Sequence, residues 1–174
     1  MIPLDNQLAP SDILSFDLKI NISHRYKNIT RHHGEIVPII DWIFIVIVND
    51  EKCDEDEVFV IDQFFESLLH VGDFPMFTCT CGIFGCGGYF VNVAHTSEGI
   101  TWKTERTPFK ELQHQEQPTK FNFTWEVITK ATQQLLSLLE DLHNVHIEHS
   151  LKFDYDIKAY EKMNDELILF VDSN

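Results

Sequence analysis

Three cysteines stand close together in this sequence, and a thiol can bind a metal, form a disulfide or act as a nucleophile. Cys79 and Cys81 are two residues apart, so their thiols point to one face if the segment is a strand. The next four residues begin and end with glycine, which tolerates the positive φ of a tight turn. We therefore expect Cys86 nearly opposite Cys81, across a cysteine- and glycine-rich hairpin of residues 79–88.

Two interpretations of this cluster involve no oxidation or catalysis. In the first, small buried cysteines fill a tight corner. In the second, a structural zinc ion is bound by Cys79, Cys81 and Cys86, with a fourth ligand from Cys53, His70 or His95. The spacing supplies three ligands and lacks the paired C-x2-C knuckles of ordinary zinc sites. We therefore expect no cofactor and keep a zinc-binding module as the alternative.

Two further interpretations use the reactivity of the thiols. One is a disulfide between two of the cysteines, which needs oxidising conditions. The other is a reactive or redox-sensing thiol, although no lysine or arginine lies within the loop to lower the pKa of a cysteine. Phosphate-binding loops, nucleophile elbows and the H-E-x-x-H zinc motif are missing from the sequence. We therefore expect no enzymatic activity, with a cysteine-dependent enzyme as a further alternative.

The acidic excess indicates what kind of partner the protein favours. Asp and Glu total 28 against 13 Lys and Arg, a net charge of −15. A surface of this charge repels phosphate backbones and anionic membranes, and it attracts basic proteins. We therefore expect a basic protein partner, no nucleic acid and no membrane. The N-terminus lacks a basic segment followed by an apolar one, so we expect a cytoplasmic protein with reduced thiols.

The first half of the chain predicts strands around one helix. Residues 13–23 alternate between apolar and polar side chains, which predicts a half-buried strand. Residues 24–34 hold two of the three arginines and are predicted to form a solvated hairpin loop, with a local anion contact as the alternative. Residues 42–48 are apolar on both faces, which predicts a central covered strand. Helical spacing of apolar residues predicts a helix over about 58–71.

The second half predicts a hairpin, a strand, a long helix and a further strand. Residues 89–94 and 100–104 are strand-like and joined by a loop with a glycine. A short aromatic strand then leads into an amphipathic helix over about 126–143. We interpret the histidines that follow, His143, His146 and His149, as a polar helix end. Strands are predicted at 151–157 and 167–171, with a turn or short helix at 158–165. The whole chain, 1–174, is thus expected to be one α+β domain with a largely antiparallel sheet.

The cysteine stretch also carries a resemblance. Residues 78–88, TCTCGIFGCGG, are followed by a strand and then by Ile100-Thr101-Trp102. This pattern resembles small uncharacterised bacterial proteins in which a C-x-C-G-x-x-G-C turn leads to an apolar strand and a V/I-x-W ending. The short aromatic strand before the long helix resembles the same proteins. The resemblance implies no assigned activity and carries no catalytic residues to this chain.

Together these features favour a non-enzymatic, acidic protein-binding domain. The small single domain, the charge and the missing catalytic motifs are typical of an inhibitor or immunity-type protein, of bacterial or phage anti-defence origin, that binds a basic partner. A zinc or thiol-sensor module centred on the three cysteines is the second hypothesis. A cysteine-dependent enzyme is the third.

Overall fold

A computed structural model describes residues 11–53, 57–79, 88–105 and 118–174 of the chain. Within these residues the protein is a single α+β domain with antiparallel sheets, as the sequence predicts. One sheet has the order β1-β2-β3, and the other is a five-stranded meander, β4-β5-β6-β7-β8. The strands are β1 Leu14–Thr30, β2 His33–Val48, β3 Glu51–Lys52, β4 Glu57–Phe59, β5 Gly72–Cys79, β6 Gly88–His95, β7 Gly99–Thr104 and β8 Thr119–Thr124. The helices are α1 Ile61–Leu69, α2 Trp125–Glu148 and α3 Ile157–Asp172.

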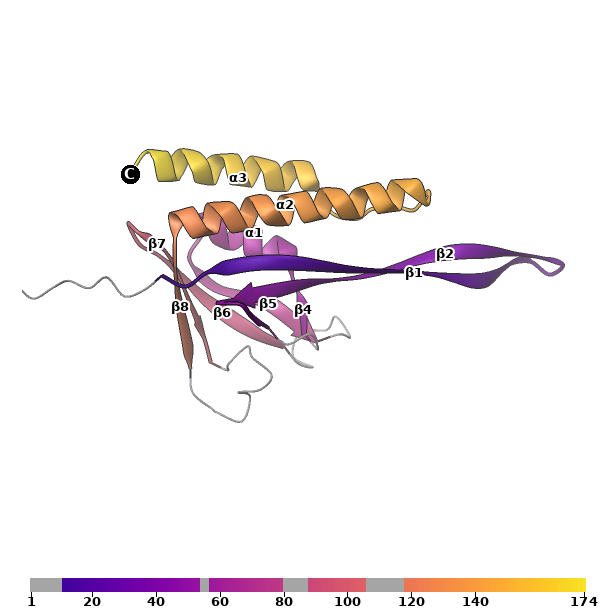
Figure 1. The fold of residues 1–174 in the computed structure, drawn as a ribbon, viewed down its shortest axis with the longest axis horizontal. Helices are drawn as coiled ribbons and strands as arrows, with labels where there is room; N and C mark the ends of the chain where they lie inside the picture. The colour runs from indigo at the N-terminus through magenta and orange to yellow at the C-terminus, as the bar shows by residue number, and fades with distance from the viewer. Residues whose placement is uncertain (1–10, 54–56, 80–87, 106–117) are drawn as a thin grey trace, which may run out of the picture.

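Strands β1 and β2 form the feature that dominates the shape of the molecule. They pair along nearly their whole length, from Leu14 opposite Val48 to Thr30 opposite His33. Their first part packs on the body, and the rest extends as a two-stranded ribbon well beyond it (Figure 1). The predicted strand at 13–23 is confirmed, but the predicted loop at 24–34 is wrong. Only Arg31 and His32 form the turn, because the strand pairing continues to the tip.

The strand predicted at 42–48 is confirmed, with Phe44 and Ile45 buried on its two faces. It is the end of β2 and pairs with β1, not with the five-stranded sheet. Its other side carries only the two-residue strand β3, reached through a tight turn. Asn49 and Asp50 both have positive φ, 52° and 66°, the backbone conformation of a type I′ turn. Asn-Asp suits that turn because short polar side chains tolerate the left-handed region.

The two predicted helices are present with different ends. α1 is shorter than predicted because Val60 donates its backbone N–H to the Met76 carbonyl oxygen of β5, at 2.7 Å, just before the helix begins. α2 is longer than predicted: it begins after Thr124, whose hydroxyl accepts from the Val127 N–H at 3.3 Å, and continues to Glu148. Its buried stripe continues past Leu142 to His146, so the last turn packs on the body.

The strands predicted at 151–157 and 167–171 are wrong. Residues 151–156 have no regular structure, and a single helix, α3, covers 157–172. Tyr160, Asn164 and Leu167 are buried at helical spacing, so the final apolar run continues one face of that helix. A short apolar run is compatible with a strand or with a buried helix segment. Here the run packs against α2 as part of a helix.

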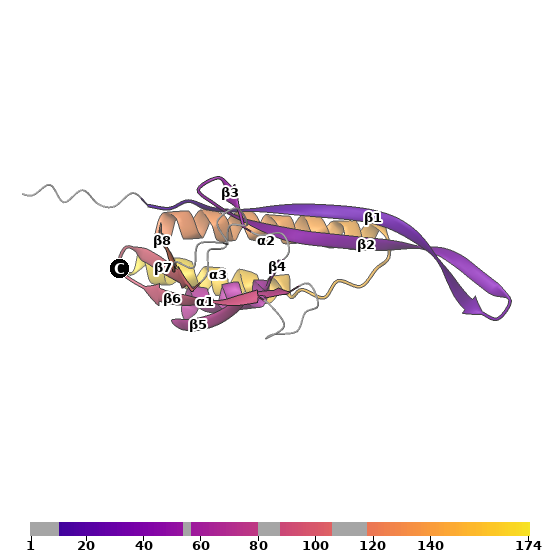
Figure 2. The ribbon, with the colours of Figure 1, turned by 90° about the horizontal axis from the view of Figure 1, so that it is seen from below.

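The core lies between the two sheets and the helices. α2 contacts β1 on one side and β7, β8 and α3 on others, and in Figure 2 it lies alongside the ribbon. The inward faces of β6, β7 and β8 supply buried apolar side chains, as the predicted hairpin of 89–94 and 100–104 requires. Phe64 of α1 is fully buried, and its ring meets those of Phe16 and Trp102 from the two sheets.

Phe64→Ala is therefore expected to lower the free energy of unfolding by about 3–5 kcal/mol, because it removes a fully buried ring and leaves a cavity. Phe90→Ala is the matched control, since Phe90 lies on the outward face of β6 with 57% exposure. The control should change stability by less than about 0.5 kcal/mol. Urea unfolding of both variants measures the difference. Equal losses in the two variants would contradict the core described above.

α3 is attached to α1 through Tyr160. Its ring stacks on Phe65 with centroids 4.4 Å apart, and its hydroxyl donates a hydrogen bond to the Asp62 carboxylate. Burial raises the pKa of Tyr160 far above the ordinary tyrosine value, and the bonded carboxylate raises it further. The folded protein therefore holds this proton more tightly than the unfolded chain, whose tyrosines ionise at about pH 10.

The resulting stabilisation is complete below about pH 10 and is lost as the pH rises above that value. We expect the unfolding free energy of the wild type to fall more steeply above pH 10 than that of Tyr160→Phe. Tyr26→Phe, at an exposed tyrosine, should keep the wild-type slope. Denaturant titrations at a series of pH values test this. A Tyr160→Phe slope equal to that of the wild type would show that the phenol makes no such contribution.

Candidate functional site

The cysteine stretch falls partly within the described residues. Cys79 ends β5 and pairs across the sheet with Glu57 of β4, and the structure records it as disulfide-bonded. A cysteine in a disulfide has no thiolate to offer a metal or a substrate. Cys53 is buried in the core, with 5% exposure. Cys81, Cys86 and the predicted turn lie outside the described residues. The two strands that flank them pair antiparallel, with Thr78 opposite Gly88.

The histidines considered as a fourth zinc ligand lie elsewhere. Gly72, at the start of β5, pairs with Val93 of β6, so His70 and His95 lie at the opposite end of these strands from Cys79. An eight-residue strand is about 25 Å long, far beyond the reach of a shared metal. His95 Nε2 lies 2.8 Å from the Ser67 carbonyl oxygen of α1, and His70 is exposed. Across the described part of the chain, no group of three potential ligands could hold a metal ion.

The histidines near the end of α2 do more than form a polar helix end. His146 is 3% exposed, and its Nδ1 lies 2.8 Å from the Leu142 carbonyl oxygen. Its ring meets Trp42 of β2 edge to face at 5.0 Å and Phe153 at 5.4 Å. Trp42 also donates its Nε1–H to the Tyr155 hydroxyl at 3.4 Å. These contacts hold the base of the ribbon against α2 and the 151–156 segment.

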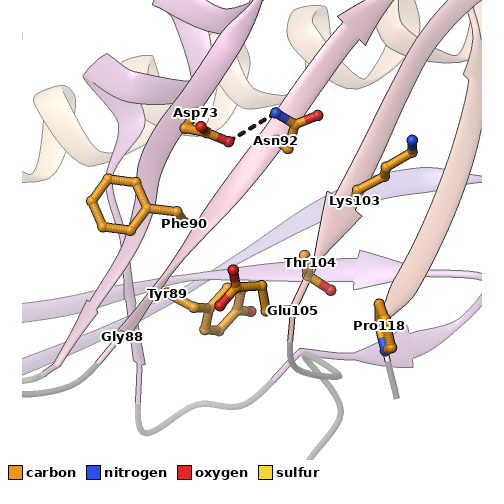
Figure 3. A pocket seen from close by; sticks show the side chains of 9 residues that line it. All are labelled: Asp73, Gly88, Tyr89, Phe90, Asn92, Lys103, Thr104, Glu105 and Pro118. Carbon is orange, nitrogen blue, oxygen red and sulfur yellow. Dashed lines mark hydrogen bonds between the residues drawn. The ribbon is translucent and has the colours of Figure 1, made fainter. Parts of the chain in front are cut away.

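A cavity of about 530 Å³ lies on the outward face of the five-stranded sheet, over β5, β6 and β7 (Figure 3). Asp73, Asn92 and Lys103 face it from three neighbouring strands in one cross-strand row, and the Asn92 amide donates to the Asp73 carboxylate at 2.8 Å. The buried Thr104 hydroxyl, also in its wall, has no hydrogen-bond partner among the described residues. The described lining contains no cysteine, histidine or serine, so it supplies binding groups and no nucleophile paired with an imidazole base.

The ribbon carries several exposed apolar side chains. Residues opposite one another on β1 and β2 share a face, so the face that is buried at Phe16 continues outward along the ribbon. Toward the tip this face carries Ile22, Tyr26 and Ile36, which are 42%, 64% and 71% exposed. We call this surface the ribbon face and define it by those three residues. Where the ribbon leaves the body, a shallow hollow is lined by Lys19, Ile20, Asn21, Asp41, Trp42 and Ile43.

Hydrogen bonds at the base of the ribbon show which backbone groups point outward. The Phe16 N–H donates to Gln134 Oε1 at 2.9 Å, and the Leu18 N–H donates to Asp17 Oδ1 at 2.8 Å. Neither group pairs with β2, so even-numbered residues of β1 direct their N–H and C=O away from it. On β2, the Val46 carbonyl accepts from the Cys53 N–H, which shows the same alternation. The pairing keeps this register as far as Asn28.

This alternation explains why Pro38 is tolerated within a strand. Pro38 pairs with His24, an even-numbered position, so a residue there would direct its N–H outward. Proline lacks that N–H, and its presence costs no bond between β1 and β2. Local sequence patterns did not predict the ribbon, although Arg25-Tyr26-Lys27 continues the alternation of polar and apolar residues along β1.

The charge of the ribbon tip is opposite to that of the rest of the chain. Residues 24–34 contain Arg25, Lys27 and Arg31 and no acidic residue. The remainder is therefore more acidic than the net charge of −15 suggests. Arg25 and Lys27 are exposed, and among the described residues neither takes part in an ion pair.

No known protein family, curated protein or solved structure matches this chain. None of the described helices has the length and apolar character needed to cross a membrane.

The state of Cys79 can be tested directly. When thiols are blocked in the denatured, unreduced protein, we expect Cys53 to be labelled and Cys79 to stay unlabelled, because Cys79 is in a disulfide. Reduction before labelling should modify both. Mass mapping of the peptides gives the result, and elemental analysis is made on the same sample. Labelling of Cys79 without reduction, together with about one mole of zinc per mole of protein, would favour the zinc module instead.

Proposed function

We propose that this protein is a non-enzymatic protein-binding domain and that the β1–β2 ribbon makes the contact. The observation that carries the proposal is the ribbon face, an apolar surface beyond the body with exposures of 42–71%. A two-stranded ribbon is marginally stable alone, and exposed strand edges promote unwanted pairing. An exposed apolar surface on such an element is typical of a site that a partner protein covers.

The anchoring of the ribbon supports this role. Trp42, Phe44, His146 and Tyr155 hold its base through edge-to-face ring contacts. Burial raises the pKa of Tyr155, so its hydroxyl stays protonated to a higher pH than that of an exposed tyrosine. A ribbon held at its base presents its face in a defined direction, which lowers the entropy lost on binding.

The basic partner expected from the net charge would meet the body and not the ribbon tip. α2 beyond its middle, the 151–156 segment and α3 expose nine carboxylates and three lysines. The carboxylates are Glu140, Asp141, Glu148, Asp154, Asp156, Glu161, Asp165, Glu166 and Asp172. This surface attracts a partner with a basic region and speeds its association at low salt. An inhibitor or immunity-type protein would use this surface to bind its basic partner.

The ribbon variant Tyr26→Ser/Ile36→Ser tests the proposal. Proteins captured from native lysate by the wild-type chain should be reduced about tenfold with this variant, because removing apolar contact residues costs about 1–2 kcal/mol of binding. Val71→Ser/Leu169→Ser is the matched control, with exposures of 64% and 68% elsewhere on the surface. Quantitative mass spectrometry compares the three captures at low and high salt.

Equal capture by the ribbon variant and the control would show that the ribbon face is not the contact. Capture that is unchanged at high salt would remove the electrostatic part of the proposal and leave the apolar contact in place.

A further inference from the structure

We infer that the open edge of β1 binds an extended segment of the partner whose residues alternate between apolar and acidic, as an added antiparallel or parallel strand. This inference rests on the proposed function and names the chemistry of the segment that the ribbon recognises. In strand addition the backbone hydrogen bonds supply affinity, and the alternating side chains supply specificity.

The two edges of the ribbon are not equivalent. On β2, Pro38 removes an outward N–H in the middle of the exposed part, and β3 pairs with the end at Ile47 and Val48. A proline at this position is a known way to block the edge of a sheet. On β1, the outward N–H groups of Phe16 and Leu18 are already bonded to side chains. From Ile20 to Asn28 the outward positions of β1 contain no proline, so this edge can accept a strand.

The side chains along that edge define the partner segment. Even-numbered residues lie on the ribbon face, where Ile22 and Tyr26 favour apolar neighbours. Odd-numbered residues lie on the opposite face, where Arg25 and Lys27 are exposed and make no ion pair with a described residue. Cross-strand pairs of opposite charge stabilise a sheet, and like charges opposite each other destabilise it. An added strand with alternate acidic residues matches both faces at once.

The same charges disfavour a second copy of this chain as the occupant. If the segment from Ile20 to Thr30 paired antiparallel with itself along its full length, Arg25 would lie opposite Arg25 of the other copy, on the two-fold axis. In the register shifted by two residues, Arg25 would lie opposite Lys27 on both sides of the axis. The ribbon therefore combines an edge that is open to other chains with a charge pattern that opposes self-association.

A labelled ten-residue peptide of alternating valine and glutamate is the probe, and the same peptide with serine in place of glutamate is its control. Fluorescence anisotropy should show saturable binding of the glutamate peptide. Binding of the serine peptide should be weaker by about tenfold, because it lacks the charges that pair with Arg25 and Lys27. Arg25→Glu/Lys27→Glu should remove this preference.

Two proline variants separate edge pairing from simple charge attraction. His24→Pro removes an outward N–H from the β1 edge and should weaken glutamate-peptide binding by about tenfold, since one backbone bond is lost and the added strand is interrupted. Pro38→Ala restores an outward N–H on the β2 edge and should leave binding within about twofold of the wild type, because that edge is not the one that pairs. Circular dichroism melts confirm that both variants fold. Unchanged binding by His24→Pro, or clearly stronger binding by Pro38→Ala, would overturn the assignment to β1.

The outcomes keep the inference apart from the proposed function. If neither peptide binds but the Tyr26→Ser/Ile36→Ser variant still loses captured proteins, strand addition is wrong and the ribbon face is still a contact. If neither peptide binds and the Tyr26→Ser/Ile36→Ser variant captures as much protein as the control, strand addition and the ribbon contact are both wrong. Concentration-dependent dimerisation by sedimentation equilibrium that Arg25→Glu/Lys27→Glu alters would instead identify a second copy as the occupant and overturn the inference.

Discussion

The burial of Phe64 is the interaction on which the rest of the structure depends. This side chain of α1 is 0% exposed, and its ring contacts Phe16 of β1, Phe59 of β4 and Trp102 of β7. It therefore joins the two sheets, which share no strand. α2 closes the same core with Leu135 and Leu139, which are also fully buried. Together with the ring contacts of Trp42 and Phe44 to His146 and Tyr155, this contact holds the base of the ribbon in a defined position on the body.

The ribbon acquires its properties from that attachment. Near the body, β1 and β2 have one face covered, and the pleat places alternate side chains there. Toward the tip the same pleat continues and the cover ends, so Tyr26 and Ile36 are well exposed, while Ile22 is partly exposed opposite the buried Ile40. Pro38 and the cations at the tip limit which edge can pair and with what charge. The element therefore combines an exposed apolar face with a basic tip.

Structural elements that depend on residues close together in the sequence were predicted well. The α+β class, the hairpin of residues 89–104 and the existence of both amphipathic helices follow from the period of apolar residues. The end of α2 was predicted too early because His143, His146 and His149 are polar by type, and only the contact with Trp42 shows that His146 is buried. The segment 167–171 was predicted as a strand because a short apolar run has no period of its own. Its helical state comes from packing against α2.

The sequence by itself determined the strands and helices with strong periodicity, the acidic balance and the cluster of cysteines. The tertiary structure alone decided that residues 24–34 belong to a ribbon, because strand pairing is a contact between distant residues and His24 opposite Pro38 carries no local signal. It also decided that His70 and His95 lie far from Cys79, since strand direction sets which ends meet. The ribbon extends past the end of α2, which leaves its outer part without a helix beside it. The relative lengths of the ribbon and α2 are not visible in any local sequence pattern.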